Sequence, residues 1–262
     1  MLVFACLVPH TPLLIPEVAK ENLSLLSDTV KAYQFLEHEL YATKPDLIII
    51  LSSHAQDTKE TFSINQNPKL RVDFKKFGDF LTNLEFNNDI GFGYKIKEAA
   101  ETKMPVFLSA EADLSYGFAV PLFYLTPHLP KIKIVAINSA KLAAQTHLSF
   151  GEIIKEQIDS SSQRIAVVVA GDLSHRLHQD SPAGFSPRGQ EFDQAIMKYL
   201  AQADLKSLVA LDENLVKEAQ ECSWRSLLIL TSIIKDFNFK AEKLSYQAPF
   251  GIGYLTFNFG LK

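Results

Sequence analysis

Three histidines each follow an apolar run that predicts a β-strand: His10, His54 and His175. The clearest run is 165–170, which is β-branched and small, and Gly171 breaks it shortly before the third histidine. Open α/β sheets bind their ligands in the crevice at the carboxyl ends of the strands. If the three strands are parallel neighbours, we therefore expect the three imidazoles to share one site.

Such a site would be suited to a metal ion. Two neutral imidazoles and one carboxylate form the facial triad of non-haem Fe(II) oxygenases, and zinc hydrolases use similar ligands. Glu221 is the first candidate for the third ligand, because it lies in a predicted helix that is otherwise apolar. A buried acid without a partner would be costly there, and a bound cation offsets that cost. Cys222 is the competing ligand, and by spacing alone Glu221 could equally be a solvent-facing residue.

The elements that would position these residues alternate between strands and helices. Apolar runs predict strands at 2–8, 47–51, 106–109, 132–137 and 165–170. Helical spacing predicts helices at 18–41, 90–102, 118–125, 140–158, 188–201, 205–211 and 215–234. This alternation predicts an α/β fold whose central, mostly parallel or mixed sheet has helices on both faces. We interpret residues 1–262 as a single domain.

Two parts of the chain depart from this alternation. The closing segments 241–247 and 251–259 have the pattern of edge or antiparallel strands. Residues 55–90 mix polar residues with regularly spaced apolar ones. We expect this stretch to form a short hairpin or a small insertion over the crevice.

Composition excludes several classes of protein. The chain has 262 residues, of which 47% are hydrophobic, and its net charge is -4, so it lacks the basic surplus of a nucleic-acid-binding protein. Two cysteines cannot build a disulfide framework, which favours a reducing compartment. The first apolar run has no basic region before it, and no apolar stretch reaches the roughly 18 residues of a membrane span. We expect a soluble cytoplasmic protein without membrane contact.

Five segments occur in the order typical of the class III extradiol ring-cleavage dioxygenases. They are 9–16 (PHTPLLIP), 52–54 (SSH), 171–175 (GDLSH), 181–185 (SPAGF) and 221–223 (ECS). The chain therefore resembles the catalytic-subunit superfamily typified by protocatechuate 4,5-dioxygenase. The resemblance covers nearly the whole chain, down to 250–254 (FGIGY). Together these motifs are specific for the superfamily, although not for one activity.

This resemblance implies a function and roles for individual residues. By position, His10 and His54 match the two histidine ligands of Fe(II), and Glu221 matches the carboxylate ligand. His175 matches the second-sphere acid and base, a role for which an imidazole is suited because its pKa lies near the working pH. The implied reaction opens a catechol-type aromatic ring with O2. Fe(II) is the expected cofactor, with Zn(II) as the alternative.

One departure from the family pattern bears on activity. Many of its dioxygenases carry an Asp-His pair where this chain has Ser115 and Tyr116, so a second active-site imidazole is replaced by a phenol. Memo proteins, which belong to the same superfamily, place a cysteine in the third-ligand region, as Cys222 would. Two alternatives therefore stay open: a Memo-like metal-binding relative without dioxygenase activity, and a zinc hydrolase on the same fold. The quaternary state is also open between a homodimer and a complex with a small partner subunit.

Overall fold

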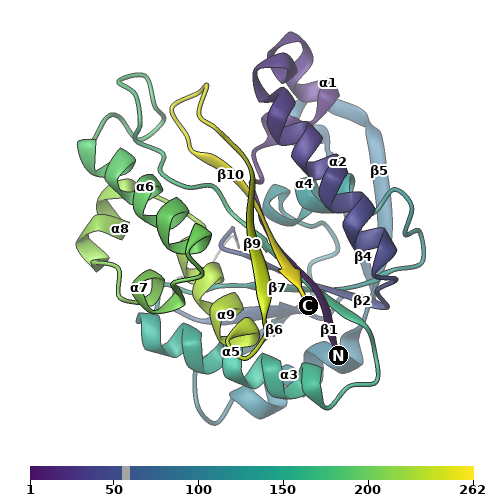
Figure 1. Ribbon diagram of the computed structural model, residues 1–262. Coiled ribbons are helices and arrows are strands. Elements are labelled where there is room, and N and C mark those ends of the chain that lie inside the picture. The colour runs from purple at the N-terminus through teal and green to yellow at the C-terminus, as the bar shows by residue number, and fades with distance from the viewer. Residues whose placement is uncertain (55–59) are drawn as a thin grey trace.

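The apolar runs of the sequence form the centre of a ten-stranded mixed sheet (Figure 1). This computed structural model describes residues 1–54 and 60–262. Its central strands are β1 (Leu2–Val8), β2 (Leu47–Ser52) and β8 (Ile165–Ala170), with β8 parallel to both of the others and between them. A strand covered on both faces needs apolar residues at nearly every position, which explains the uninterrupted runs.

Further strands extend the sheet on both sides of this parallel centre. The strand order is β4-β5-β7-β2-β8-β1-β10-β9, while β3 pairs with both β6 and β7. These strands are β3 (Phe62–Asn65), β4 (Lys69–Phe74), β5 (Asp79–Asn88), β6 (Val106–Ser109), β7 (Lys133–Asn138), β9 (Phe239–Gln247) and β10 (Tyr254–Leu261). β7 is parallel to β2, whereas β9 and β10 are antiparallel, as their alternating pattern predicts.

Helices cover both faces of the sheet, because its strands send alternate side chains into two separate apolar cores. The α-helices are α1 (Pro16–Ala19), α2 (Ser27–Ala42), α3 (Ile90–Ala100), α4 (Tyr116–Leu125), α5 (Ala144–Asp159), α6 (Pro187–Ala201), α7 (Leu205–Val209), α8 (Glu213–Ala219) and α9 (Trp224–Ile234). The 3-10 segments are η1 (Pro12–Leu14), η2 (Lys20–Leu26) and η3 (Lys75–Phe77). Helices α3, α5 and α9 pack into one core, and α2 and α4 into the other (Figure 1).

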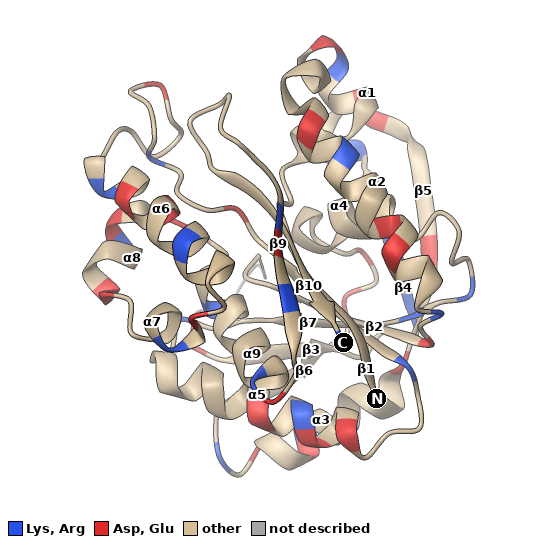
Figure 2. Cartoon of the chain, viewed as in Figure 1, with Lys and Arg blue, Asp and Glu red and all other residues tan. Residues whose placement is uncertain are grey.

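The outer surfaces of the helices carry most of the charge in the view of Figure 2, where acidic and basic residues are interspersed. This distribution agrees with the near-balanced composition of the chain. Within the described ranges, none of the helices combines the length and the apolarity that crossing a membrane requires.

The predicted α/β fold, with a mostly parallel mixed sheet between layers of helices, is confirmed. The hairpin expected within residues 55–90 is the antiparallel pair β4 and β5, and β5 joins the main sheet by pairing Asn87 and Asn88 with β7. Residues 55–59, at the start of that stretch, lie outside the described residues.

The single helix predicted over 215–234 is wrong. The chain forms α8 and α9 instead, and it turns between them at Gln220, whose φ of 55° lies in the left-handed region. Glu221 then caps the second helix by accepting hydrogen bonds from the backbone N–H groups of Ser223 and Trp224. Hydrophobic periodicity could not reveal this break, because both helices continue the same apolar spacing.

The close approach of α5 to α9 predicts a stability effect at Gly151. A Cβ atom there would overlap the carbonyl oxygen of Ile229 on α9 and would lie 2.8 Å from Cβ of Ser232. We expect Gly151→Ala to lower the free energy of unfolding by about 1–3 kcal/mol, because the two helices must move apart. Urea unfolding followed by circular dichroism measures this change.

The matched control is Gly91→Ala in α3, where the nearest atom to the added methyl group is Asp89 Oδ1 at 3.8 Å. This variant should stay within about 1 kcal/mol of the wild type, since alanine favours a helix and meets no clash. Equal destabilisation by both substitutions would contradict the assignment to helix contact.

Candidate metal centre

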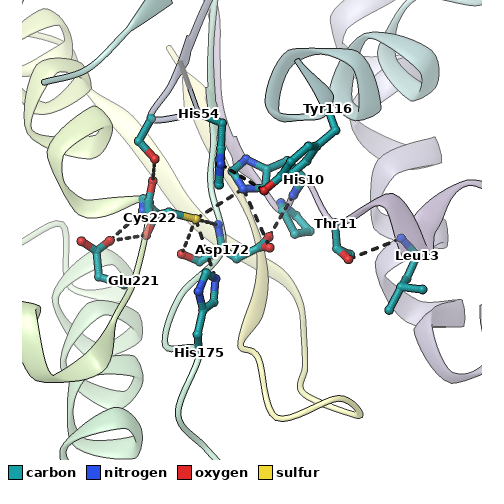
Figure 3. Close-up of polar contacts among 12 residues, drawn as sticks. His10, Thr11, Leu13, His54, Tyr116, Asp172, His175, Glu221 and Cys222 are labelled. Carbon is teal, nitrogen blue, oxygen red and sulfur yellow. Dashed lines mark hydrogen bonds and ion pairs between the residues drawn. The ribbon is translucent and has the colours of Figure 1, made fainter. Parts of the chain in front are cut away.

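The strand order brings the three predicted histidines to one edge of the sheet. His10 lies two residues after β1, and His54 lies two residues after β2, with β8 between these strands. Their rings meet edge to face, with centroids 4.5 Å apart. His175 follows β8 and approaches the same place from below in Figure 3. The structure therefore brings the three histidines close together, as the strand pattern predicts.

Cys222 lies between the imidazoles (Figure 3). Its Sγ is 3.3 Å from Nε2 of His10 and 3.9 Å from Nε2 of His175. His10, His54 and Cys222 each offer a ligand atom, and these atoms all lie within 4.8 Å of one another. The loop between α8 and α9 delivers the thiol, and Ser53, beside His54, holds that loop by donating a hydrogen bond to the Cys222 carbonyl.

Glu221 is not brought to the histidines. One oxygen of its carboxylate, Oε2, accepts hydrogen bonds of 2.6 Å from the backbone N–H groups of both Ser223 and Trp224. Figure 3 shows this carboxylate on the side of Cys222 away from His10. The acid that the sequence offered as third ligand is thus engaged as a helix cap, which explains how it is accommodated in partly buried surroundings. The thiol of its neighbour Cys222 lies 3.3 Å from Nε2 of His10 instead.

Asp172 is a central residue of the site to which the sequence analysis assigned no role. Its Oδ1 accepts a hydrogen bond of 2.9 Å from the backbone N–H of His10. Its own N–H lies 3.2 Å from Sγ of Cys222, and its carbonyl accepts from the Cys222 N–H at 3.2 Å. Asp172 therefore fixes the end of β1 to the loop that carries the thiol. The signal that could have revealed it is an acid two residues after a buried strand.

Gly171 allows the thiol loop to reach the strand ends. A Cβ atom at this position would lie 2.6 Å from Cα of Ser223 and 2.8 Å from its Cβ. Since backbone atoms cannot give way at such distances, only glycine permits this contact. The glycine that ends the central apolar run therefore has a packing role.

The electrostatic environment favours neutral imidazoles. Burial lowers the pKa of His10 to about 3, and burial together with the neighbouring His10 and His175 lowers the pKa of His54 to about 3. Burial also lowers the pKa of His175, although the adjacent Asp172 carboxylate opposes this shift. Neutral imidazole is the form that binds metals, so His10 and His54 are ready to bind without losing a proton.

The other titratable groups keep their protons more firmly than usual. Burial raises the pKa of Asp172 to about 6 and the pKa of Tyr116 to about 12. Burial, with the nearby carboxylates of Asp172 and Glu221, also holds the pKa of the Cys222 thiol well above its ordinary value. The Tyr116 phenol is accordingly protonated at neutral pH and lies 3.0 Å from Nδ1 of His54. That contact fixes the orientation of the ring, as outer partners of metal-binding histidines commonly do.

These residues fit a metal ion. Nε2 of His54 is buried and has no hydrogen-bond partner among the described residues, although a buried polar atom normally has one. Ligand bonds of 2.0–2.1 Å for nitrogen and 2.3 Å for sulfur place such atoms about 3.6 Å apart on a tetrahedral ion. The 3.3 Å between the His10 nitrogen and the Cys222 sulfur is close to that value. A thiol in the set favours softer metals than the facial triad with its carboxylate does.

A cavity of about 690 Å³ opens beside His54. Tyr116 and Phe77 line it, with their rings edge to face and 5.7 Å between centroids. Phe77 belongs to η3, the turn between β4 and β5, so the 55–90 stretch contributes to the lining of this cavity. Asn138, at the end of β7, also lines the cavity; it is buried and has no hydrogen-bond partner for its Oδ1 among the described residues.

Comparisons with known proteins identify the family of the chain. A family model described as the catalytic LigB subunit of aromatic ring-opening dioxygenase matches residues 4–257. Protein CA_C1420 of Clostridium acetobutylicum is 27% identical over 258 residues, which are 95% of this chain and 55% of that protein. The chain therefore spans about half the length of this curated relative.

A solved structure has a similar fold. The crystal structure of the uncharacterized protein JW3007 from Escherichia coli K12 gives a TM-score of 0.69 and covers 98% of this chain and 100% of its own. The two sequences are 18% identical, so the likeness concerns the fold alone.

Substitutions at the two neighbouring ligand candidates, Glu221 and Cys222, should affect different properties, one the stability of the fold and the other metal binding. We expect Cys222→Ser to weaken metal binding more than about tenfold, because it removes the sulfur ligand. Glu221→Ala should leave metal binding within about threefold and instead lower the free energy of unfolding by about 1–2 kcal/mol, because α9 loses its cap. Metal titration and urea unfolding of both variants measure the two effects. Loss of metal in Glu221→Ala, with retention in Cys222→Ser, would restore the carboxylate as ligand.

The raised pKa of the thiol predicts pH-dependent metal affinity. The metal-free protein holds the Cys222 proton, whereas the metal binds the thiolate, so binding releases one proton and tightens as pH rises. Between pH 6 and 8 the Kd for Zn²⁺ should fall about tenfold per pH unit, since His10 and His54 are already neutral there. Calorimetry in buffers of different ionisation enthalpy counts the released proton. A slope that Cys222→Ser leaves unchanged would show that another group supplies it.

Proposed function

Because the chain belongs to the family of catalytic LigB subunits of aromatic ring-opening dioxygenases, we propose that it is a metal-dependent enzyme that opens a catechol-type ring with O2. The observation that supports this proposal best is the convergence of His10, His54 and Cys222 beside a cavity that could admit an aromatic ring. His175 and Tyr116 flank the same place and can hold or move protons.

In this proposal His10, His54 and Cys222 hold the ion, and Fe(II) is the metal that ring opening calls for. When bound, the metal would bring the substrate hydroxyls and O2 together and carry electrons between them. The protein would supply the three ligands, and the cavity beside His54 offers room for a substrate. Burial of the ligands excludes water and keeps both imidazoles neutral.

His175 is the proposed acid and base. Its pKa is lowered by burial, so at neutral pH the ring can accept a proton from a substrate hydroxyl. Asp172, only 4% exposed and hydrogen-bonded to the backbone of His10, lies near enough to favour the imidazolium that then forms. The same imidazole can later return the proton, so one residue serves both steps.

Tyr116 and Phe77 are the proposed contacts for the substrate ring. Tyr116 keeps its phenolic proton because its pKa is raised to about 12, so it can donate a hydrogen bond where many relatives have a histidine. Its ring and that of Phe77 form an aromatic wall of the cavity. Edge and face contacts with a flat substrate would be favourable on this wall.

A second candidate is favoured by Cys222 itself. A thiolate in place of the carboxylate suits zinc or another soft metal better than it suits an oxygen-activating Fe(II) site. The chain would then be a metal-binding relative without ring-opening activity, or a zinc hydrolase. The metal that copurifies with the protein separates these alternatives: iron with oxygen uptake supports the first proposal, and zinc without it supports the second.

We also propose a cytoplasmic location for the protein, acting as one domain. Cys6 and Cys222 are both free, as a reducing compartment would keep them. Self-association into a homodimer, or binding of a small partner subunit near the cavity, is part of this proposal, and light scattering in solution measures it.

The test uses protein loaded anaerobically with Fe(II) and a panel of catechols, with O2 uptake and product absorbance as readouts. We expect His175→Ala to keep the iron but to lower kcat by about 10²–10⁴-fold, because it removes the acid and base. His178→Ala, at an exposed position three residues on, is the control and should keep full activity. Full turnover in His175→Ala would remove His175 from the mechanism. No oxygen uptake with any catechol, with iron bound, would overturn ring opening.

A further inference from the structure

Cys222 belongs to two sets of potential metal ligands. One set is His10, His54 and Cys222; the other is Asp172, His175 and Cys222, and in each the ligand atoms all lie within 4.8 Å of one another. We propose that the second set is a separate position for a zinc-like divalent cation, which shares the Cys222 sulfur with the first metal.

The contacts of the second set have the dimensions of a metal site. Nε2 of His175 lies 3.9 Å from Sγ of Cys222, which is long for a hydrogen bond and close to the spacing of about 3.6 Å for nitrogen and sulfur on one tetrahedral ion. Carboxylate, imidazole and thiolate are all common zinc ligands. Asp172 and His175 lie close together because both belong to the loop that follows β8.

Figure 3 shows the rings of His10 and His54 above the Cys222 sulfur and the ring of His175 below it. Among the described residues, two groups of three donors have all their ligand atoms within 4.8 Å of one another, and both groups contain Cys222. His54 belongs only to the first group and His175 only to the second. A thiolate has lone pairs enough to bridge two ions, and paired metals in proteins are typically about 3.5–4 Å apart.

The charge of Asp172 supports an ion at this position. Its side chain is 6% exposed, and in the described part of the chain its one ion-pair contact is with Nε2 of His10, at 3.9 Å. At 3.9 Å this contact lies at the outer limit of an ion pair, so it compensates little of the carboxylate charge. A buried carboxylate without a cationic partner is costly, and a divalent ion bound by Asp172 would compensate its charge.

Occupation of this second position would have a consequence for catalysis. A cation on Nε2 of His175 uses the lone pair that otherwise accepts a substrate proton. Excess Zn²⁺ should therefore inhibit turnover of the iron-loaded enzyme while the iron stays bound. This consequence rests on the proposed function, whereas the existence of the second position does not.

The test counts zinc without measuring activity. Metal-free full-length protein is dialysed against a series of Zn²⁺ concentrations, and bound zinc is measured by elemental analysis. We expect two equivalents in the wild type and one in Asp172→Asn, whose amide oxygen can still accept the His10 N–H. His175→Gln should also retain one equivalent, and His54→Gln should lose the other. Asp180→Asn, at an exposed site in the same loop, is the matched control and should keep two.

The outcomes separate the alternatives. One equivalent in the wild type would overturn the proposal, and so would two equivalents in both Asp172→Asn and His175→Gln, since surface residues would then hold the second ion. X-ray absorption of the two-zinc protein adds an independent measure: a zinc–zinc distance of about 3.5–4 Å supports a shared sulfur, and its absence overturns the bridge. Melting curves check that each variant is folded. If either Asp172→Asn or His175→Gln is not folded, the other one serves as the test of the second position.

Discussion

The parallel pairing of β1, β8 and β2 is the constraint on which the site depends. Parallel neighbours end at the same edge of a sheet, so residues that are distant in sequence leave their strands within reach of one another. His10 and His54 follow the two outer strands of this trio, and Asp172 follows the middle one. The apolar runs that bury these strands therefore also position the polar groups beyond them. Stability and site geometry have a common origin here.

Burial gives this edge its chemistry. Removing the imidazoles, the carboxylate and the thiol from water lowers the pKa values of the histidines and raises those of the acids. The result is a group of potential ligands that are neutral or that lose their protons only at raised pH, and a cation can bind them. An aromatic wall formed by Tyr116 and Phe77 continues from this group into the cavity, where a flat organic molecule would meet both the donors and the rings.

Much of this arrangement could be predicted from the sequence, for identifiable reasons. Buried parallel strands require apolar runs, so the strands that precede His10, His54 and His175 were evident, and with them the mixed α/β fold. The position of Glu221 could not be predicted in this way. Its role depends on the break at Gln220, which leaves the apolar periodicity of α8 and α9 intact. The role of Asp172 could not be derived from the sequence either. An acid two residues after a buried strand marks it as a candidate, but its contacts to His10 and Cys222 join segments that are far apart in the sequence.

Two adjacent residues of the short loop between α8 and α9 have different roles. Glu221 caps α9, whereas the side chain of Cys222 lies against the histidines. An oxygen donor and a sulfur donor are thus separated by a single step along a segment that lies outside the sheet. Lengthening or shortening that loop by one residue would exchange which donor reaches the imidazoles without disturbing any strand. The kind of donor that faces the imidazoles is therefore set by the length of this loop as much as by the identity of its residues.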